Sequence, residues 1–396
     1  MKILLVNDYA TPTAGAEIML LVYRDGLRAR GHDVRVFASR AELIPGPSFA
    51  DYTCFGTTSR LQALNSALNL SARVQLAKVL KEFQPDVVHV KMFLWQLSPL
   101  ILSLLKDVPA VYQIVTYKAI CPNGKKLLPD GSVCRSPAGT ICLSGGCLTP
   151  QSWLAMMLQR RLWLRQQNVF DAFVTPSPSM KRWLENEGIG PVEVISNACR
   201  LREPRAPLSG DPILAFAGRL SEEKGIGTMI RAFAEIQDAV PGVRLWIAGD
   251  GPEGASLKRL AREVGIEART DFFGALPFEE MDRRFERAWA QIVPSKWDEP
   301  FGMVAIEALM RGTAVVASNT GGPGDIVEEG ESGVLFPPGD VSALAGAMLK
   351  VARDRQLCET LGARGHEIAL ERYGHQSVPQ RLEALFERVI EGGRGQ

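Results

Sequence analysis

Two carboxylates eight positions apart, Glu299 and Glu307, enclose a Pro-Phe-Gly turn in the last third of the chain. If a helix begins near Phe301, Glu307 lies about two turns along it, at roughly 1.5 Å per residue. Glu299 then lies just before the helix, beside backbone N–H groups without intrahelical partners and the positive end of the dipole. Carboxylates accept hydrogen bonds from sugar hydroxyls, and N–H groups bind phosphate or hydroxyl oxygens. The spacing therefore indicates a site for a polyhydroxylated, negatively charged ligand.

A second candidate loop, residues 218–225, follows a strand expected at 214–217. Gly218 permits close approach of the backbone to a ligand, and Arg219 and Lys224 can neutralise a diphosphate. A βα loop with solvated charges explains the composition equally well. The position of the loop at the end of a strand favours ligand binding.

The run 249–254 matches the G-x-G-x-x-G pattern of dinucleotide-binding sites. That fingerprint belongs to the first βα turn of a domain, whereas the strand expected at 214–217 already precedes this run. Pro252 also stiffens the loop. A tight turn near a ligand, formed by Gly249 and Gly251, is therefore the preferred interpretation, ahead of a nicotinamide site.

Two further glycine-bearing loops follow expected strands. Residues 11–17, which include Gly15, precede a helix, and a small residue at a helix N-terminus suits phosphate binding. A plain turn before a helix explains this loop as well. Residues 321–325 form a glycine-rich loop at the same edge of the second sheet.

Short β-rich runs alternate with helix-length segments, which is typical of parallel sheets covered by helices on both faces. The strands are expected at 3–6, 34–37, 87–90, 110–115, 172–175, 192–195, 214–217, 244–248, 271–273, 290–293, 314–317 and 333–335. Helices are expected at 16–30, 71–83 and 377–390. The pattern restarts after a proline-bearing loop near residue 205, which predicts an α/β fold of two doubly wound Rossmann-like domains.

The bulk composition excludes several classes of protein. A chain of 396 residues with 46% hydrophobic and 22% charged residues is typical of a soluble globular protein of two domains. A formal net charge of +1 gives no indication of nucleic-acid binding. No apolar run reaches about 18 residues, and the apolar N-terminal run is too short for a signal peptide. We therefore expect a cytoplasmic protein whose cysteines are reduced, buried or metal-bound.

Four of the seven cysteines, Cys121, Cys134, Cys142 and Cys147, fall in one segment rich in turn residues, with the spacing C-x12-C-x7-C-x4-C. No pair has the C-x2-C spacing of the usual zinc ribbons. A structural metal site is one interpretation of this segment. Reduced thiols in a surface loop are the preferred one.

Residues 153–165 mix basic and apolar side chains at roughly helical spacing. Peripheral contact with a membrane surface, at its inner face, or with a lipid-linked acceptor is one interpretation. A core-facing helix with a solvated basic side is the preferred one.

An ordered series of motifs gives a more specific indication than any single one. It runs from Gly-Arg-Leu and Glu-Lys-Gly at 218–225 through Ala-Gly-Asp-Gly-Pro, Pro-Ser-Lys-Trp-Asp-Glu-Pro-Phe-Gly and Glu-Ala-Leu-Met-Arg-Gly-Thr to Phe-Pro-Pro-Gly-Asp at 336–340. The series resembles the retaining nucleotide-sugar glycosyltransferases of the GT-B fold, a family that includes sucrose synthase and phosphatidylinositol mannosyltransferase. The resemblance covers nearly the whole chain.

The resemblance implies a role for each matching residue. Glu299 would hold hydroxyls of the donor sugar, Glu307 the nucleoside ribose, and Arg219 and Lys224 the leaving diphosphate. The donor-binding set would also include glycines that let loops approach the ligand and residues at the start of the helix: Gly15, Gly218, Gly249, Gly251, Phe301, Gly302, Met303 and Val304.

The resemblance also implies a domain assignment and a mechanism. Residues 1–203 would bind the acceptor and residues 204–374 the nucleotide sugar, of UDP or GDP type, with the last segment, 375–396, crossing back to the first domain. No cofactor or metal would be required for catalysis, because Arg and Lys stabilise the leaving group. The sugar would keep its anomeric configuration through front-face attack, and the diphosphate oxygen would take the acceptor proton.

The first half departs from the family pattern in ways that bear on the acceptor side. His89-Val90-Lys91 and Cys121-Pro122 fit a branch with a cysteine-bearing excursion, but Lys91 replaces a second histidine. Val115-Thr116-Tyr117 stands where His-Asp-Tyr is expected, and valine cannot donate the hydrogen bond of that histidine. Ala14 stands where the first glycine of a Gly-Gly pair is common. Lys91, Thr116 and Tyr117 are the candidate residues on the acceptor side.

Two other function classes stay open at this point. The replacement at Val115 allows a nucleotide-sugar epimerase or a donor-binding homologue without transfer activity. The 249–254 run alone supports a nicotinamide oxidoreductase.

Overall fold

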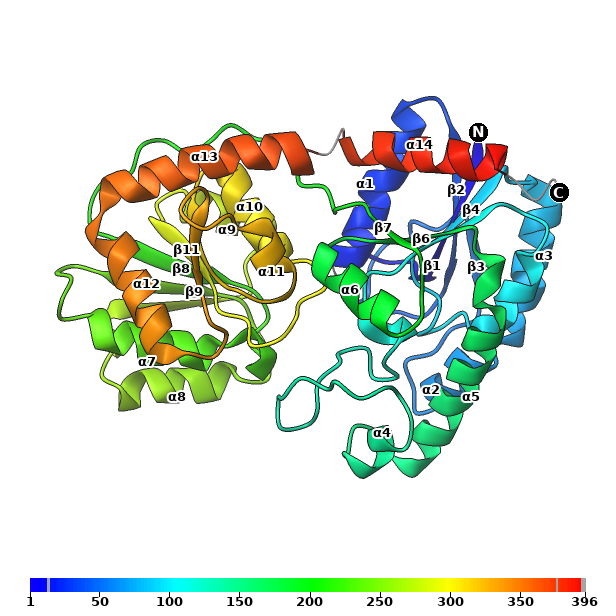
Figure 1. The fold of residues 1–396 in the computed structure, drawn as a ribbon, viewed down its shortest axis with the longest axis horizontal. Helices are drawn as coiled ribbons and strands as arrows, with labels where there is room; N and C mark the ends of the chain where they lie inside the picture. The colour runs from blue at the N-terminus through cyan, green and yellow to red at the C-terminus, as the bar shows by residue number, and fades with distance from the viewer. Residues whose placement is uncertain (13–14, 375–376, 393–396) are drawn as a thin grey trace. The chain divides into compact units, whose positions relative to one another are not determined.

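A computed structural model describes residues 1–12, 15–374 and 377–392. The chain divides into two compact units, one formed by residues 1–198 with the C-terminal helix α14 (Ser377–Glu391) and the other by residues 199–374. Each unit contains one parallel sheet with helices packed around it (Figure 1). The first unit ends a few residues before the expected boundary at 203/204, and the α/β architecture agrees with the sequence prediction.

The first unit is built on a seven-stranded parallel sheet with the order β3-β2-β1-β4-β5-β6-β7. Its strands are β1 (Lys2–Tyr9), β2 (Asp33–Ser39), β3 (Tyr52–Cys54), β4 (Val87–Val90), β5 (Ala110–Gln113), β6 (Ala172–Thr175) and β7 (Val192–Val194). Every strand predicted for this half is confirmed. The prediction missed β3, because this strand is three residues long and has only one buried side chain.

The helices of the first unit connect and cover these strands. They are α1 (Gly15–Ala29), α2 (Gln62–Ala67), α3 (Leu70–Phe83), α4 (Ile141–Ser144), α5 (Pro150–Gln166) and α6 (Pro178–Asn186), with short 3-10 turns η1 (Pro99–Leu104), η2 (Tyr117–Ala119) and η3 (Gln167–Val169). Local signals fix some of their starts. The Thr149 hydroxyl accepts a hydrogen bond from the Ser152 N–H at 3.3 Å, and Pro150 occupies the first turn of α5.

The second unit has a six-stranded parallel sheet with the order β10-β9-β8-β11-β12-β13. Its strands are β8 (Ile213–Ala217), β9 (Arg244–Ala248), β10 (Thr270–Gly274), β11 (Ala290–Val293), β12 (Ala314–Ser318) and β13 (Gly333–Phe336). Every strand predicted for this half is confirmed. Its helices are α7 (Ile226–Ile236), α8 (Gly254–Glu263), α9 (Phe278–Phe285), α10 (Met303–Arg311), α11 (Gly321–Ile326), α12 (Val341–Arg353) and α13 (Arg355–Tyr373), with the 3-10 turns η4 (Glu222–Lys224) and η5 (Glu267–Arg269).

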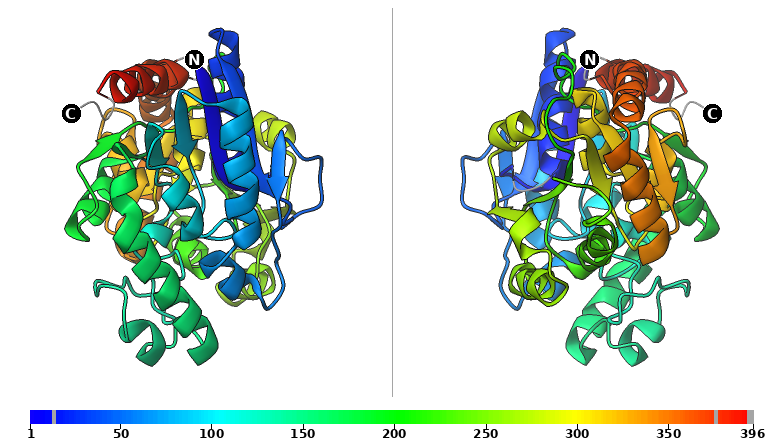
Figure 2. Two further views of the ribbon diagram at one scale, coloured as in Figure 1. Left: turned by 90° about the vertical axis from the view of Figure 1, so that its right-hand side faces the viewer. Right: turned by 90° about the vertical axis from the view of Figure 1, so that its left-hand side faces the viewer.

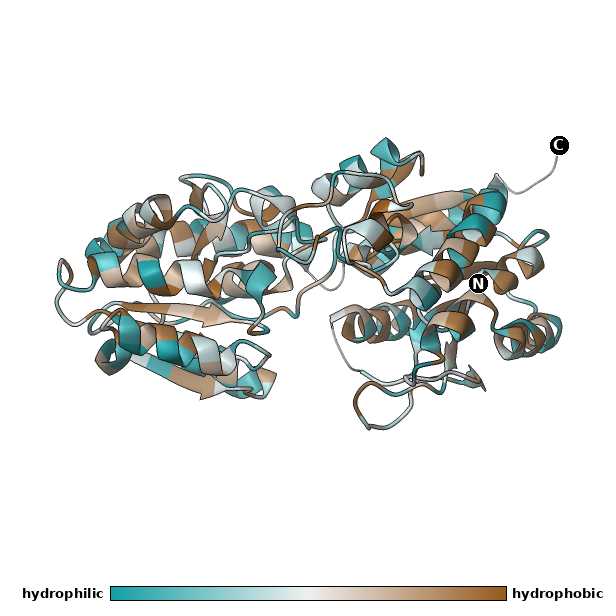
Figure 3. Cartoon of the chain, turned by 90° about the horizontal axis from the view of Figure 1, so that it is seen from below, coloured by the Kyte–Doolittle hydropathy of each residue, from teal (hydrophilic) through white to brown (hydrophobic). Residues whose placement is uncertain are grey.

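The apolar pattern explains why these sheets lie inside their units. All five residues of β8 and of β12 are buried, as expected for parallel strands covered on both faces. The strands are mostly brown in Figure 3, whereas the helices combine brown and teal segments. Helix α12, for example, buries Leu344, Met348 and Val351 and leaves Ser342 and Lys350 exposed to solvent.

The C-terminal helix α14 packs on α1 within the first unit (Figures 1 and 2). Pro379 approaches α1 so closely that a Cβ on Gly26 would lie 2.4 Å from its Cγ. Glu383 accepts a hydrogen bond at 2.7 Å from His32, which follows α1, and also pairs with Arg30.

Among the described helices, none is both long and apolar enough to cross a membrane.

Candidate active site

The carboxyl ends of β8, β11 and β12 are neighbours in the second sheet, so the loops that follow them meet at one edge. These are the loops that carry the predicted residues at 218–225, 294–302 and 321–325. Sequence reasoning placed each loop at a strand end. The sheet order brings them together.

Lys224 and Glu299 form an ion pair across two of these loops. The Lys224 Nζ atom lies 2.7 Å from Oε1 of Glu299, and the hydroxyl of Ser295 donates a hydrogen bond to the same oxygen. Glu299 is buried and Lys224 is largely covered. Both donors use one carboxylate oxygen, so Oε2 of Glu299 can accept a hydrogen bond from a ligand hydroxyl.

A glycine permits this pairing. Gly225 ends the short turn η4 with a φ of +69°, and a Cβ there would lie 1.9 Å from the carbonyl oxygen of Pro294. The N–H of Lys296 donates to the carbonyl of Glu223 at 2.9 Å, which holds the two loops together. Close contact between the backbones of the loops after β8 and β11 therefore brings Lys224 within hydrogen-bonding distance of Glu299.

Arg219 follows Gly218 at the end of β8, and its side chain is exposed to solvent. Within the described ranges it has no ion-pair partner, unlike Lys224. Arg219 is therefore available to bind an anionic ligand, whereas Lys224 is paired with the Glu299 carboxylate.

Gly249 and Gly251, in the loop after β9, pack against the loop after β8. A Cβ on Gly249 would lie 1.8 Å from the carbonyl oxygen of Gly218, and one on Gly251 would lie 2.4 Å from that of Leu220. The N–H of Leu220 donates to the carbonyl of Asp250 at 2.9 Å. Because β9 is not the first strand of the unit, the topology also agrees with the preference against a nicotinamide site.

Helix α10 begins directly after Gly302, which caps it with a φ of +114°. The first backbone N–H groups of a helix, here those of Met303 and Val304, have no carbonyl partner one turn earlier. Phe301 is buried, and its ring packs at 6.0 Å from that of Tyr373. Glu299 thus precedes the helix by four residues, and the N–H groups of Met303 and Val304 lie in its first turn, as predicted.

The glycine-rich loop after β12 supports the segment that leads into α10. The N–H of Gly322 donates to the carbonyl of Glu299 at 2.8 Å, and a Cβ on Gly322 would lie 1.6 Å from the carbonyl oxygen of Phe301. A Cβ on Gly321 would lie 2.4 Å from the backbone nitrogen of Glu299. These glycines therefore hold Glu299 in position through backbone contacts.

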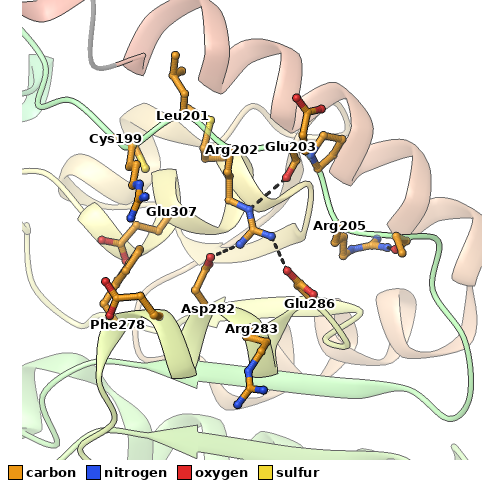
Figure 4. Close-up of a pocket in the computed structure, with 15 residues that line it drawn as sticks. Cys199, Leu201, Arg202, Glu203, Arg205, Phe278, Asp282, Arg283, Glu286 and Glu307 are labelled. Atoms are coloured by element: carbon orange, nitrogen blue, oxygen red, sulfur yellow. Dashed lines mark hydrogen bonds and ion pairs between the residues drawn. The ribbon is translucent and has the colours of Figure 1, made fainter.

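Glu307 lines a pocket of about 430 Å³ in the second unit (Figure 4). The walls are the segment Cys199–Ala206, residues of α9 such as Phe278 and Asp282, and Met310 of α10. Burial raises the pKa of the Glu307 carboxyl to about 7, while the neighbouring Arg311 guanidinium lowers it and the Asp282 carboxylate raises it.

A network of ion pairs that the sequence prediction missed surrounds Glu307. Asp282 accepts a hydrogen bond from Nε of the fully buried Arg311 at 2.8 Å and also pairs with Arg202. Arg202 reaches Glu286 at 2.7 Å (Figure 4). Arg311 is four residues after Glu307 on one helix, a spacing that could have indicated the pair. Asp282 and Arg202 are distant in sequence and gave no such signal.

The candidate acceptor residues lie in the first unit. Lys91 is buried, its Nζ lies 4.1 Å from the centroid of the Tyr23 ring, and burial lowers the pKa of its ammonium to about 7. Thr116 caps η2 by accepting the Lys118 N–H at 3.4 Å. Tyr117 is fully buried, with its ring 6.1 Å from that of Trp183.

Other first-unit residues named from the sequence have simpler surroundings. Gly15 is exposed at the start of α1, and Ala14 lies outside the described residues. Val115 packs beside the apolar cluster of Tyr9, Ala41 and Met92.

The four clustered cysteines lie around one cavity of the first unit. Cys121, Cys134, Cys142 and Cys147 all line one small apolar cavity of about 10 Å³. Nonetheless, no group of three or more His, Cys, Asp or Glu in the described ranges is arranged to hold a metal. The thiols have separate partners instead, such as Asn123 Oδ1 at 2.9 Å from Cys121 Sγ.

We predict that Gly225→Ala destabilises the second unit more than an ordinary glycine substitution. The new Cβ would meet the Pro294 carbonyl, so we expect a loss of more than about 2 kcal/mol in the free energy of unfolding by urea titration. Gly265→Ala is the control, because its φ is +75° but nothing lies within 4 Å of the new Cβ. It should lose only about 1 kcal/mol. Equal losses in both variants would contradict the role of the close contact.

Two family models match the chain in succession. The model described as Glycosyltransferase Family 4 matches residues 13–203, and the model described as Glycosyl transferases group 1 matches residues 200–368. Glycogen synthase from Mycobacterium tuberculosis is 32% identical over 286 residues, which cover 69% of this chain and 62% of that protein. The chain spans less than two thirds of the length of the curated relatives it matches.

Solved structures share the fold at low sequence identity. Sucrose-phosphate synthase from Thermosynechococcus elongatus is similar with a TM-score of 0.73 and 20% identity, over 99% of this chain and 100% of that chain. The HepE protein of Anabaena, solved in complex with UDP, has a TM-score of 0.68 and 20% identity, over 98% and 100% of the two chains. With family matches running from residue 13 to residue 368 and two Rossmann-like units of this fold, the chain belongs to the GT-B glycosyltransferases.

Proposed function

We propose that this protein transfers a sugar from a nucleoside-diphosphate sugar to an acceptor, with retention of anomeric configuration and without a catalytic metal. The observation that carries the proposal is the buried Glu299 carboxylate, paired with Lys224 and placed four residues before Met303, the first residue of α10. A carboxylate for sugar hydroxyls, a cation and free helix N–H groups are thereby combined at one sheet edge.

Each end of the donor has a distinct partner in this proposal. Glu299 accepts hydroxyls of the sugar through Oε2, and the N–H groups of Met303 and Val304 bind oxygens of the sugar or phosphate. Glu307 accepts the ribose hydroxyls at its pocket. UDP is the favoured nucleotide, because a protein of the same fold was solved in complex with UDP.

The leaving group is stabilised by Arg219 and Lys224. An ammonium has three N–H donors, so Lys224 can keep its bond to Glu299 and still donate to a phosphate oxygen. The bond between the anomeric carbon and the phosphate oxygen breaks while the acceptor oxygen bonds the same carbon on the same face. The acceptor proton passes to the released diphosphate oxygen.

The acceptor is proposed to bind the first unit. Lys91, Thr116 and Tyr117 stay predictions for that side, as does contact of Gly15 with the diphosphate. The burial of Tyr117 favours a structural role for its ring. The matched relatives include synthases and glycosyltransferases, which favours transfer over the epimerase or binding-only alternative.

We predict that wild-type protein binds at least one UDP-, GDP-, ADP- or dTDP-sugar in isothermal titration calorimetry. Glu299→Gln and Lys224→Met should each weaken that binding by about 10- to 100-fold, because each removes a charged hydrogen-bond partner. Glu263→Gln, on the exposed surface of α8, is the matched control and should bind like the wild type. Failure of the wild type to bind any donor would refute the proposal, and donor binding without transfer to any acceptor would favour the alternative.

We predict that donor affinity depends on pH through Glu307. The pKa of this carboxyl is about 7, so it is protonated below that pH and accepts hydrogen bonds as a carboxylate above it. Donor affinity should therefore rise between pH 6 and pH 8, and Glu307→Gln should flatten this rise when titrations are repeated at each pH. A rise of the same size in Glu307→Gln would assign the effect to another group.

We predict that the product keeps the anomeric configuration of the donor and that chelation does not slow the reaction. Arg219 and Lys224 would supply the charge that a divalent ion supplies elsewhere. Proton NMR of the product made with and without EDTA checks both expectations. An inverted anomeric centre would rule out front-face attack, and loss of activity restored by added Mg²⁺ would rule out metal independence.

A further inference from the structure

Within the described residues, one surface of the first unit exposes a group of aliphatic side chains. We call it the α2–α3–α5 face, after the helices that form it. Leu61, Leu70 and Leu154 have 65%, 68% and 68% of their surfaces exposed, and exposed apolar residues that gather in one patch mark interaction surfaces. The other exposed apolar residues of this face are Phe55, Leu64, Leu68, Val74 and Leu158.

Packing and helical spacing bring these residues together. Helices α2 and α5 are in contact, and the Gln159 side chain of α5 donates to the Ser66 carbonyl of α2 at 2.6 Å. Helices α2, α3 and α5 also lie on one side of the unit, which faces the viewer in Figure 2, left. On α5, Leu154 and Leu158 are followed at helical spacing by Arg161 and Arg165, all of them exposed.

The charge on these segments is strongly one-sided. The chain as a whole has 45 basic and 44 acidic residues, yet neither residues 52–81 nor residues 131–170 contain an aspartate or glutamate. All lysines, arginines and other charged residues of the two segments are therefore basic: Arg60, Arg73, Lys78, Lys81, Arg135, Arg160, Arg161 and Arg165. This face is therefore positively charged, although the net charge of the whole chain is close to zero.

These cations also lack intramolecular partners. In the part of the chain that the structure describes, Arg60, Arg73, Lys78, Arg161 and Arg165 are exposed and form no ion pair. By contrast, arginines elsewhere on the same unit pair with carboxylates, as in the contacts of α1 and β2: Arg24–Asp25, Arg30–Glu383 and Arg35–Asp33. The cations of this face can therefore bind the anionic groups of an external surface.

We propose that the α2–α3–α5 face docks on a membrane that contains anionic phospholipids. Aliphatic side chains enter the boundary between headgroups and acyl chains, and the surrounding cations bind lipid phosphates. Nucleic acid is a poorer match, because leucines cannot stack on bases as aromatic side chains do. The inference goes beyond sugar transfer and does not depend on the donor site.

The test is co-sedimentation of the full chain with vesicles in the absence of nucleotide sugar. The protein should bind vesicles of phosphatidylcholine with phosphatidylglycerol, and binding should weaken with phosphatidylcholine alone or when salt rises well above about 0.15 M. Arg161→Glu combined with Arg165→Glu should lower the partition coefficient by at least about 30-fold. Leu154→Gln should lower it as well, without a change in the salt dependence.

Matched controls lie in the second unit. Arg259→Glu combined with Lys350→Glu reverses two exposed charges on α8 and α12, and Leu370→Gln replaces an exposed leucine of α13. These variants should bind vesicles like the wild type, and circular dichroism should show that all variants are folded. Equal loss in the control and test variants, equal binding to both vesicle types, or self-association through this face without vesicle binding would each overturn the proposal.

Discussion

The candidate site depends on the ion pair between Lys224 and Glu299, because this contact joins loops that follow two different strands. A charge buried without a partner is costly, and each of these side chains relieves that cost for the other. The pair also fixes which carboxylate oxygen is used internally and which is left for a ligand. The contact is possible only because Gly225 lets its backbone approach Pro294.

Other glycines of the second unit serve the same arrangement through backbone packing. Gly249 and Gly251 press the loop after β9 against the loop after β8, while Gly321 and Gly322 hold the segment that carries Glu299. A side chain at any of these positions would push the loops apart. The glycine-rich pattern that resembles a phosphate-binding fingerprint is therefore explained largely by contacts between loops.

Charge is distributed unevenly between the interior and the surface. Near Glu307, the buried Arg311 pairs with Asp282, and burial raises the pKa of Glu307 to about 7. On the α2–α3–α5 face the cations have no such partners. Both features follow from local arrangement, and neither can be read from a net charge of +1.

The sequence by itself determined all strands but β3, the two-unit α/β architecture and the loops on which the candidate site residues lie. Buried parallel strands leave continuous apolar runs, and loops such as 218–225 and 299–303 directly follow or precede predicted elements. These are local properties, so one segment suffices to predict them. The sequence did not predict the short strand β3, because its single buried residue gives no continuous apolar run.

Only the tertiary structure decided which side chains meet. The pairing of Lys224 with Glu299, the role of Ser295, and the partners of Asp282 depend on the order of strands in the sheet and on loop packing. The cysteine cluster shows the reverse case, since spacing allowed a metal site but the folded loop gives its thiols separate partners. Spacing along the chain limits which contacts can form, whereas distances between distant segments are set by packing, and no local pattern encodes them.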